Sequence, residues 1–90
     1  MRENKIENHL RKEVEAAGWE CLKFPPLFFR GFPDRIVLKS GGVCIFVELK
    51  APKGRPTLVQ RRVHDRLRRL GFRVEVLNSI EEVDAFMVTL

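Results

Sequence analysis

Hydrophobic positions at the start of the chain follow the spacing of a helix. Between residues 2 and 17, apolar side chains recur every three or four positions, at Ile6, Leu10, Val14 and Ala17. Such spacing places them on one stripe of an α-helix, which can be buried while the rest of the helix meets solvent. Gly18 follows, and glycine commonly ends a helix. The pattern predicts an amphipathic helix over residues 2–17.

The next part of the chain changes to strand-like patterning. Residues 19–24 are rich in apolar and aromatic side chains and are closed by two prolines, which predicts a strand. A loop is expected over 27–33. Two further β-rich runs, 34–39 and 43–50, flank the sequence Ser-Gly-Gly at 40–42, and this arrangement is typical of a β-hairpin.

The second half of the chain alternates a helix, a strand and a helix. Thr57 can cap a helix that runs to Leu70 and ends at Gly71, and residues 72–77 form a further strand pattern. Ser79 can cap a short last helix with two glutamates in its first turn. A strand–helix–strand connection makes the last two strands parallel. We therefore expect an α/β fold with a mixed four-stranded sheet and flanking helices.

Length and composition indicate one small globular domain, residues 1–90. The chain has 44% hydrophobic and 32% charged residues, which is typical of a folded protein. Ninety residues bury about 60% of the surface of the unfolded chain, so the core is thin and self-association is plausible. No apolar run approaches the ~18 residues of a membrane span, and no signal peptide begins the chain. We expect a cytoplasmic protein with no membrane partner, in which Cys21 and Cys44 stay reduced.

The excess of positive charge favours an anionic partner. Seventeen Lys and Arg against twelve Asp and Glu give a net charge of +5, and five arginines lie on the predicted helix 58–70 with Asp65 as its one acid. Unpaired arginine suits phosphate, although a solvated charged face is the usual explanation of such a run. The predicted DNA-backbone contacts are Lys23, Arg30, Lys53, Arg55, Arg61, Arg62 and Arg66. His9 and His64 are expected at the surface or its boundary.

A carboxylate and an ammonium group close the most apolar strand. Within residues 43–50 side chains alternate between faces, so Glu48 and Lys50 share one face of a strand that is predicted to be buried. A two-residue hairpin turn would place Asp34 on the other face. A three-residue turn pairs Asp34 with Glu48 on the same face, with Gly42 in the left-handed conformation. We choose the three-residue turn.

Two carboxylates about 5 Å apart repel each other unless a cation lies between them. Mg²⁺ suits this arrangement because it takes oxygen ligands, and the backbone carbonyl of Leu49 is a further candidate ligand. Such an ion can activate a water for attack on a phosphodiester and stabilise the charge that develops. Lys50 would hold the attacking water and offset phosphate charge.

These residues together resemble a nuclease signature. Pro33-Asp34 followed by Glu48-Leu49-Lys50 resembles the PD-(D/E)xK pattern, and more narrowly the virus-type replication-repair nuclease (VRR-NUC) domain in its stand-alone phage and bacterial form. The matching positions span nearly the whole chain: Ile6-Glu7, Gly18, Lys23-Phe24, Arg30-Gly31-Phe32-Pro33-Asp34, Glu48-Leu49-Lys50-Ala51-Pro52, Gln60 and Leu70-Gly71.

The resemblance implies a restriction-endonuclease-like αβββαβ core, here with a short C-terminal helix, and Mg²⁺- or Mn²⁺-dependent cleavage of DNA. It implies Asp34 and Glu48 as metal ligands and Lys50 as catalytic base or water-orienting group. Glu7, from the first helix, would lie in the site near the ion without necessarily binding it. Gln60 would hydrogen-bond a water or a phosphate oxygen.

The resemblance also implies a homodimer that acts on branched DNA, such as four-way junctions, in a bacterial or phage-infected cell. No small-molecule cofactor is expected. The loop 25–30 departs from the usual Ser-, Gly- and Arg-rich pattern of the family, because residues 26–29 are apolar. A loop with three phenylalanines rarely stays exposed, so Phe28, Phe29 and Phe32 would form a dimer contact or stack on unpaired bases. The main alternative is a catalytically silent DNA-binding module with the same fold. An RNA-binding or purely structural protein is a second alternative, but neither needs a Glu-x-Lys at the end of a buried strand.

Overall fold

The computed structural model describes residues 3–25 and 29–90. The order of elements predicted from the sequence is confirmed, with bounds that differ by one or two residues. The elements are α1 (Glu3–Ala16), β1 (Glu20–Lys23), β2 (Arg35–Lys39), β3 (Val43–Leu49), α2 (Leu58–Arg69), β4 (Arg73–Leu77) and α3 (Ile80–Val88). None of the described helices is long and apolar enough to cross a membrane.

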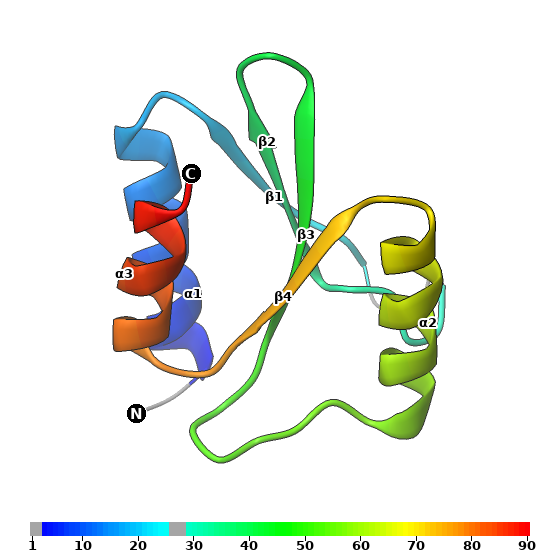
Figure 1. Ribbon diagram of the computed structural model, residues 1–90. Helices are drawn as coiled ribbons and strands as arrows, with labels where there is room; N and C mark the ends of the chain where they lie inside the picture. The colour runs from blue at the N-terminus through cyan, green and yellow to red at the C-terminus, as the bar shows by residue number, and fades with distance from the viewer. Residues whose placement is uncertain (1–2, 26–28) are drawn as a thin grey trace.

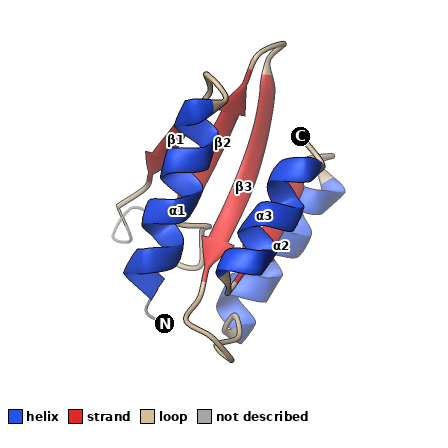
Figure 2. Ribbon diagram, turned by 90° about the vertical axis from the view of Figure 1, so that its left-hand side faces the viewer, coloured by secondary structure: helices blue, strands red, loops and turns tan. Residues whose placement is uncertain are grey.

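The four strands form one mixed sheet in the order β1-β2-β3-β4. The pairs β1–β2 and β2–β3 are antiparallel, and β3 pairs with β4 in parallel, as the strand–helix–strand connection predicted. Helices α1 and α3 cover one face of this sheet, and α2 lies alone on the other (Figures 1 and 2). The predicted mixed sheet with flanking helices is therefore confirmed.

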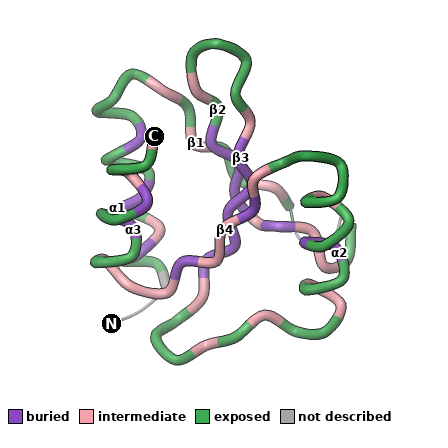
Figure 3. The backbone as a smooth tube through the Cα atoms, viewed as in Figure 1, coloured by how far each residue is buried: buried purple, intermediate pink, exposed green. Residues whose placement is uncertain are grey.

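Two hydrophobic clusters fill the space on either side of the sheet. The larger one joins the apolar stripe of α1, with Ile6, Leu10 and Val14 fully buried, to inward side chains of β2, β3, β4 and α3. The smaller one lies under α2 and is built on Ile36 and Phe46. In Figure 3 the buried segments of the chain run along the central strands and the inner sides of the helices. The central strand β3 thus has both faces covered.

The hairpin between β2 and β3 has the register that brings two acids together. Lys39 pairs with Val43, so the turn contains three residues, and Gly42 has a φ of 76° as the three-residue turn requires. At the other end of the hairpin Arg35 pairs with Val47. The next position along both strands places Asp34 opposite Glu48, which confirms the three-residue register chosen from the sequence.

Candidate active site

Asp34 and Glu48 meet where β2 begins and β3 ends. Because side chains alternate along a strand, both carboxyl groups lie on the face that α2 covers. Asp34 Oδ1 accepts a hydrogen bond of 3.2 Å from the backbone N–H of Leu49. This bond joins the loop before β2 to the end of β3 and fixes the Asp34 side chain beside Glu48.

A cavity of about 470 Å³ opens beside the two carboxylates. Its polar lining consists of Asp34, Glu48, Lys50 and Gln60, and most of the remaining wall is apolar. Among the described residues the Lys50 ammonium has no ion-pair partner within 4 Å. The structure therefore brings together four of the five residues predicted to be catalytic, with a free cationic group beside two acids.

Burial makes the pair of acids electrostatically unfavourable on its own. The pKa of Asp34 is raised from 3.8 to about 6, first because burial penalises its charged form and second because Glu48 is negative. The N–H of Leu49 and the guanidinium of Arg35 oppose this rise. Glu48 is only 3% exposed. A cation between the carboxylates would remove the repulsion and offset their lost hydration.

The donor atoms fit a divalent cation. Glu48 Oε1 is buried without a hydrogen-bond partner, which is costly for a carboxylate unless a ligand completes its contacts. Carboxylate and carbonyl oxygens are the ligands that Mg²⁺ and similar hard cations prefer. Asp34, Glu48 and the carbonyl of Leu49 are thus the residues that could hold such an ion.

His64 is buried, so the predicted position at the surface is wrong. It is 1% exposed, and its Nε2 lies 3.5 Å from Glu48 Oε1. Both atoms lack a hydrogen bond, so the imidazole and the carboxylate approach each other without completing one. The sequence holds a signal for this position, because His64 follows Gln60 by four positions and therefore shares its face of α2. That face points at the site.

Glu7 reaches the site through Arg35, a residue that the sequence pattern did not single out. Glu7 forms an ion pair with Arg35, which is 3% exposed. One nitrogen of Arg35 donates a 2.9 Å hydrogen bond to the carbonyl of Asp34 and lies 3.5 Å from its carboxylate. Glu7 does not line the cavity. Glu7 therefore contacts Arg35, the residue that holds Asp34 in place. A direct role of Glu7 near the ion stays a prediction.

Gln60 has a structural contact in addition to its place on the cavity wall. It is the third residue of α2, where its side-chain oxygen accepts a 2.8 Å hydrogen bond from Thr57 N and its own N–H donates to Thr57 Oγ1 at 3.1 Å. This capping box stabilises the start of the helix. The amide NH₂ group of Gln60 is the part left for a ligand, and its contact with a substrate stays a prediction.

Comparison with known proteins identifies the family. The chain is 48% identical over 79 residues to "Putative nuclease p44" of Acyrthosiphon pisum secondary endosymbiont phage 1, covering 88% of this chain and 85% of that protein. A solved structure described as a VRR_NUC domain superposes with a TM-score of 0.87 at 31% identity, over 94% of this chain and 92% of the other. The chain belongs to the VRR-NUC family. No protein-family model matches the chain.

This VRR-NUC domain carries exposed basic side chains on β1, on α2 and in the loops before β2 and before α2. The side chains predicted to contact the DNA backbone are all exposed: Lys23, Arg30, Lys53, Arg55, Arg61, Arg62 and Arg66. Within residues 3–25 and 29–90, none of them has an acidic partner within 4 Å. Arg68 differs, because it lies 3.7 Å from Asp65 and donates to the carbonyl of Val74. Their exposure and their lack of acidic partners agree with contacts to the DNA backbone, which stay a prediction.

The loop that precedes Asp34 is locked onto α2 by a glycine. Gly31 has a φ of 85°, and a Cβ atom built there would lie 2.7 Å from the side chain and 2.9 Å from the carbonyl oxygen of Val59. No other residue could take this backbone conformation and this close approach without strain. The N–H of Phe32 also donates to the carbonyl of Phe29 at 3.1 Å. The wall of the cavity is therefore held at a fixed distance from α2.

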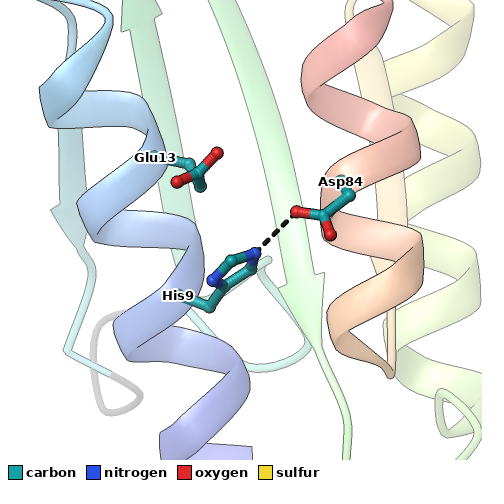
Figure 4. A group of neighbouring side chains, drawn as sticks. All are labelled: His9, Glu13 and Asp84. Atoms are coloured by element: carbon teal, nitrogen blue, oxygen red, sulfur yellow. Dashed lines mark hydrogen bonds and ion pairs between the residues drawn. The ribbon is translucent and has the colours of Figure 1, made fainter.

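A second group of potential metal ligands lies on the opposite face of the sheet. His9 and Glu13 of α1 and Asp84 of α3 point toward one another across the gap between the two helices (Figure 4), and their ligand atoms lie within 4.8 Å of one another. His9 Nε2 is 2.6 Å from Asp84 Oδ1. Glu13 and Asp84 are exposed, so the group resembles an ordinary surface ion pair. Asp84 can therefore serve as a control in tests of metal binding at Asp34 and Glu48.

Proposed function

We propose that this VRR-NUC protein is a divalent-metal-dependent DNA endonuclease that hydrolyses phosphodiester bonds. The observation that carries the proposal is the meeting of Asp34, Glu48 and Lys50 in one cavity, with a buried oxygen of Glu48 that has no hydrogen-bond partner. Membership of a nuclease family and the name of the phage relative support it.

Each residue of the site has a definite part in this proposal. The carboxylates of Asp34 and Glu48, with the carbonyl of Leu49, would bind Mg²⁺ or Mn²⁺. When bound, the ion supplies Lewis-acid polarisation of the phosphate and makes water a better nucleophile. Lys50 orients the attacking water and offsets the negative charge of the phosphate. Arg35, held by Glu7, positions Asp34.

The substrate that we propose is branched DNA, bound by a homodimer. The exposed arginines at the start of α2 would contact phosphates and orient the duplex without reading its sequence. A thin core favours a dimer, because the interface would bury apolar surface that one copy leaves exposed. Phe28, one of the residues predicted for this interface, lies outside the described residues. We place the activity in the cytoplasm of a bacterium or phage-infected cell.

The test is cleavage of linear, flapped and four-way DNA in Mg²⁺, in Mn²⁺ and in EDTA. We expect the wild type to cut only with metal and to prefer the branched substrates. Glu48→Gln keeps the size of the side chain but removes its charge, and it should lower the rate at least hundredfold, as loss of transition-state charge stabilisation typically does. Glu81→Gln, on the exposed start of α3, is the matched control and should cut like the wild type.

The result that would overturn the proposal is a wild type that binds DNA but leaves all three substrates intact with either metal. Such a result would favour the alternative of a catalytically silent DNA-binding module. Equal cleavage of linear and branched DNA would retain the nuclease and remove the preference for branches.

A further inference from the structure

Three phenylalanines form one wall of the cavity that holds the two acids. Phe24, Phe29 and Phe32 line it together with Asp34 and Glu48. The ring of Phe32 lies 5.3 Å from that of Phe24 and 5.6 Å from that of Phe29, so the three rings make a continuous aromatic surface. A site that only bound an ion and a phosphate would not need such a wall, because both of those ligands prefer polar contacts.

Core packing accounts for only part of this wall. Phe24 and Phe32 are half-buried and pack against the cluster under α2. Phe29 is different, because 46% of its surface is exposed. The guanidinium of Arg66 lies 5.8 Å from its ring centroid, which places a cationic group of the proposed DNA surface beside the exposed aromatic ring. An exposed aromatic ring next to a phosphate-binding group is suited to a nucleotide.

We propose that this cavity takes the base of a nucleotide that has left the duplex, while the phosphate of the same strand lies at Asp34 and Glu48. This rests on the proposed nuclease function and names its substrate class, which is DNA with an unpaired nucleotide at the point of cleavage. Bases stack on aromatic side chains whatever their sequence, since every base has a π-face. The volume of about 470 Å³ is in the range of small-ligand pockets, so the cavity has room for a single base.

The distance between the aromatic wall and the acids is set by the backbone. The N–H of Phe24 donates a 3.0 Å hydrogen bond to the carbonyl of Asp34, and the loop that carries Phe29 and Phe32 is pressed against α2 at Gly31. The wall therefore does not need to form when DNA arrives. A preformed pocket beside Asp34 and Glu48 would select DNA with an unpaired nucleotide next to the cleaved bond. A base that stays paired and stacked in the duplex cannot enter the pocket.

The experiment compares oligonucleotides that differ by one base. Single strands and flapped duplexes are made with an intact nucleotide or with a tetrahydrofuran abasic residue at each position beside the cleaved bond. Their affinities are measured by fluorescence anisotropy in EDTA and low salt, where no cleavage occurs, and their cleavage rates are measured in Mg²⁺ and Mn²⁺. The protein variants are Phe29→Ala, Phe29→Trp and Phe72→Ala.

Phe72→Ala is the matched control. Phe72 is 41% exposed and touches the ring of Phe46, which also contacts Phe32, but Phe72 does not line the cavity. We expect the wild type and Phe72→Ala to bind the intact strand about five- to a hundredfold more tightly than the abasic strand at one position, as one stacked base provides. Phe29→Ala should lose most of this preference, and Phe29→Trp, which keeps an aromatic face, should retain it.

Equal affinity of the wild type for intact and abasic strands at every position would overturn the proposed base pocket. An unchanged preference for the intact base in Phe29→Ala would overturn it as well.

The base pocket and the nuclease activity fail in different ways. A wild type that cuts intact and abasic DNA equally is a nuclease without a base pocket. A wild type that prefers the intact base in EDTA but cuts nothing with metal has the pocket without the proposed activity. Should Phe29→Ala not fold, retention of the preference by Phe29→Trp and its loss in Phe29→Leu test the same claim.

Discussion

Replacing Asp34 with Asn should stabilise the metal-free protein while abolishing its activity. Asp34 is 26% exposed and carries a charge that both burial and the neighbouring Glu48 disfavour. Asn has nearly the same shape, no charge, and an oxygen that can still accept the hydrogen bond from Leu49 N. The substitution removes the electrostatic penalty and keeps the contact that holds the loop to β3.

The size of the effect follows from the pKa. The folded protein raises the pKa of Asp34 from 3.8 to about 6, and at 1.36 kcal/mol per tenfold change in proton binding this corresponds to at most about 3 kcal/mol. The folded protein binds the proton more tightly than the unfolded chain does, so stability falls as pH rises from 3.8 to 6 and the penalty is complete above 6. Asp34→Asn should therefore gain up to about 3 kcal/mol at pH 7.5 and about 1 kcal/mol at pH 4.5.

The assay is urea unfolding in EDTA at both values of pH, read by the fluorescence of Trp19 and by circular dichroism. Asp65→Asn is the control, because Asp65 is 64% exposed and lies on the outer side of α2. Its substitution should change the free energy of unfolding by less than about 0.5 kcal/mol. If Asp34→Asn is no more stable than the wild type at pH 7.5, or if its advantage does not shrink at pH 4.5, the buried charge of Asp34 does not destabilise the fold.

Three further substitutions separate the roles assigned to the site, the surface and the loop. Lys50→Met should lower the rate of DNA cleavage at least hundredfold while calorimetric Mn²⁺ affinity stays within twofold, and a loss of metal binding would refute the assigned role. Removing two exposed arginines in Arg61→Ala/Arg62→Ala should flatten the slope of log affinity against log salt by about 0.9 for each phosphate that is no longer neutralised, and an unchanged slope would exclude them from the DNA surface. Gly31→Ala should lower the free energy of unfolding by about 2–5 kcal/mol. Gly41→Ala should lower it by only about 1–2 kcal/mol, because Gly41 has the same left-handed backbone but open space around it. Equal losses in the two variants would contradict the close packing of Gly31 on α2.

The fold and the acid pair can be predicted because their signals are local. The apolar stripe at Ile6, Leu10 and Val14 requires a helix, and the alternation of β3 decides which face each side chain takes. The length of the Ser-Gly-Gly turn fixes the register, and this register alone brings Asp34 opposite Glu48. A shift of one residue would send the two acids to opposite faces.

Contacts between distant elements cannot be predicted in the same way. Arg35 and Val37 lie on the same buried face of β2, so the charge of Arg35 requires a partner. Nothing in the sequence identifies Glu7 on α1 as that partner. The burial of His64 depends on how α2 is rotated against the sheet, and the arginine-rich composition of this helix masks the one local signal, which is the position of His64 one turn after Gln60. The capping box at Thr57 and Gln60 is different, because its Thr-x-x-Gln spacing is a local signal for both halves of the motif.

If Asp34 and Glu48 share one divalent cation, titration calorimetry with Mn²⁺ should detect a site that depends on both carboxylates. The wild type and Asp84→Asn should bind the metal alike, since Asp84 belongs to the exposed group on the opposite face. Asp34→Asn and Glu48→Gln should each weaken binding at least tenfold while remaining folded. The opposite pattern, in which Asp84→Asn loses the metal and the other two variants keep it, would place the ion between α1 and α3 and exclude Asp34 and Glu48 as its ligands.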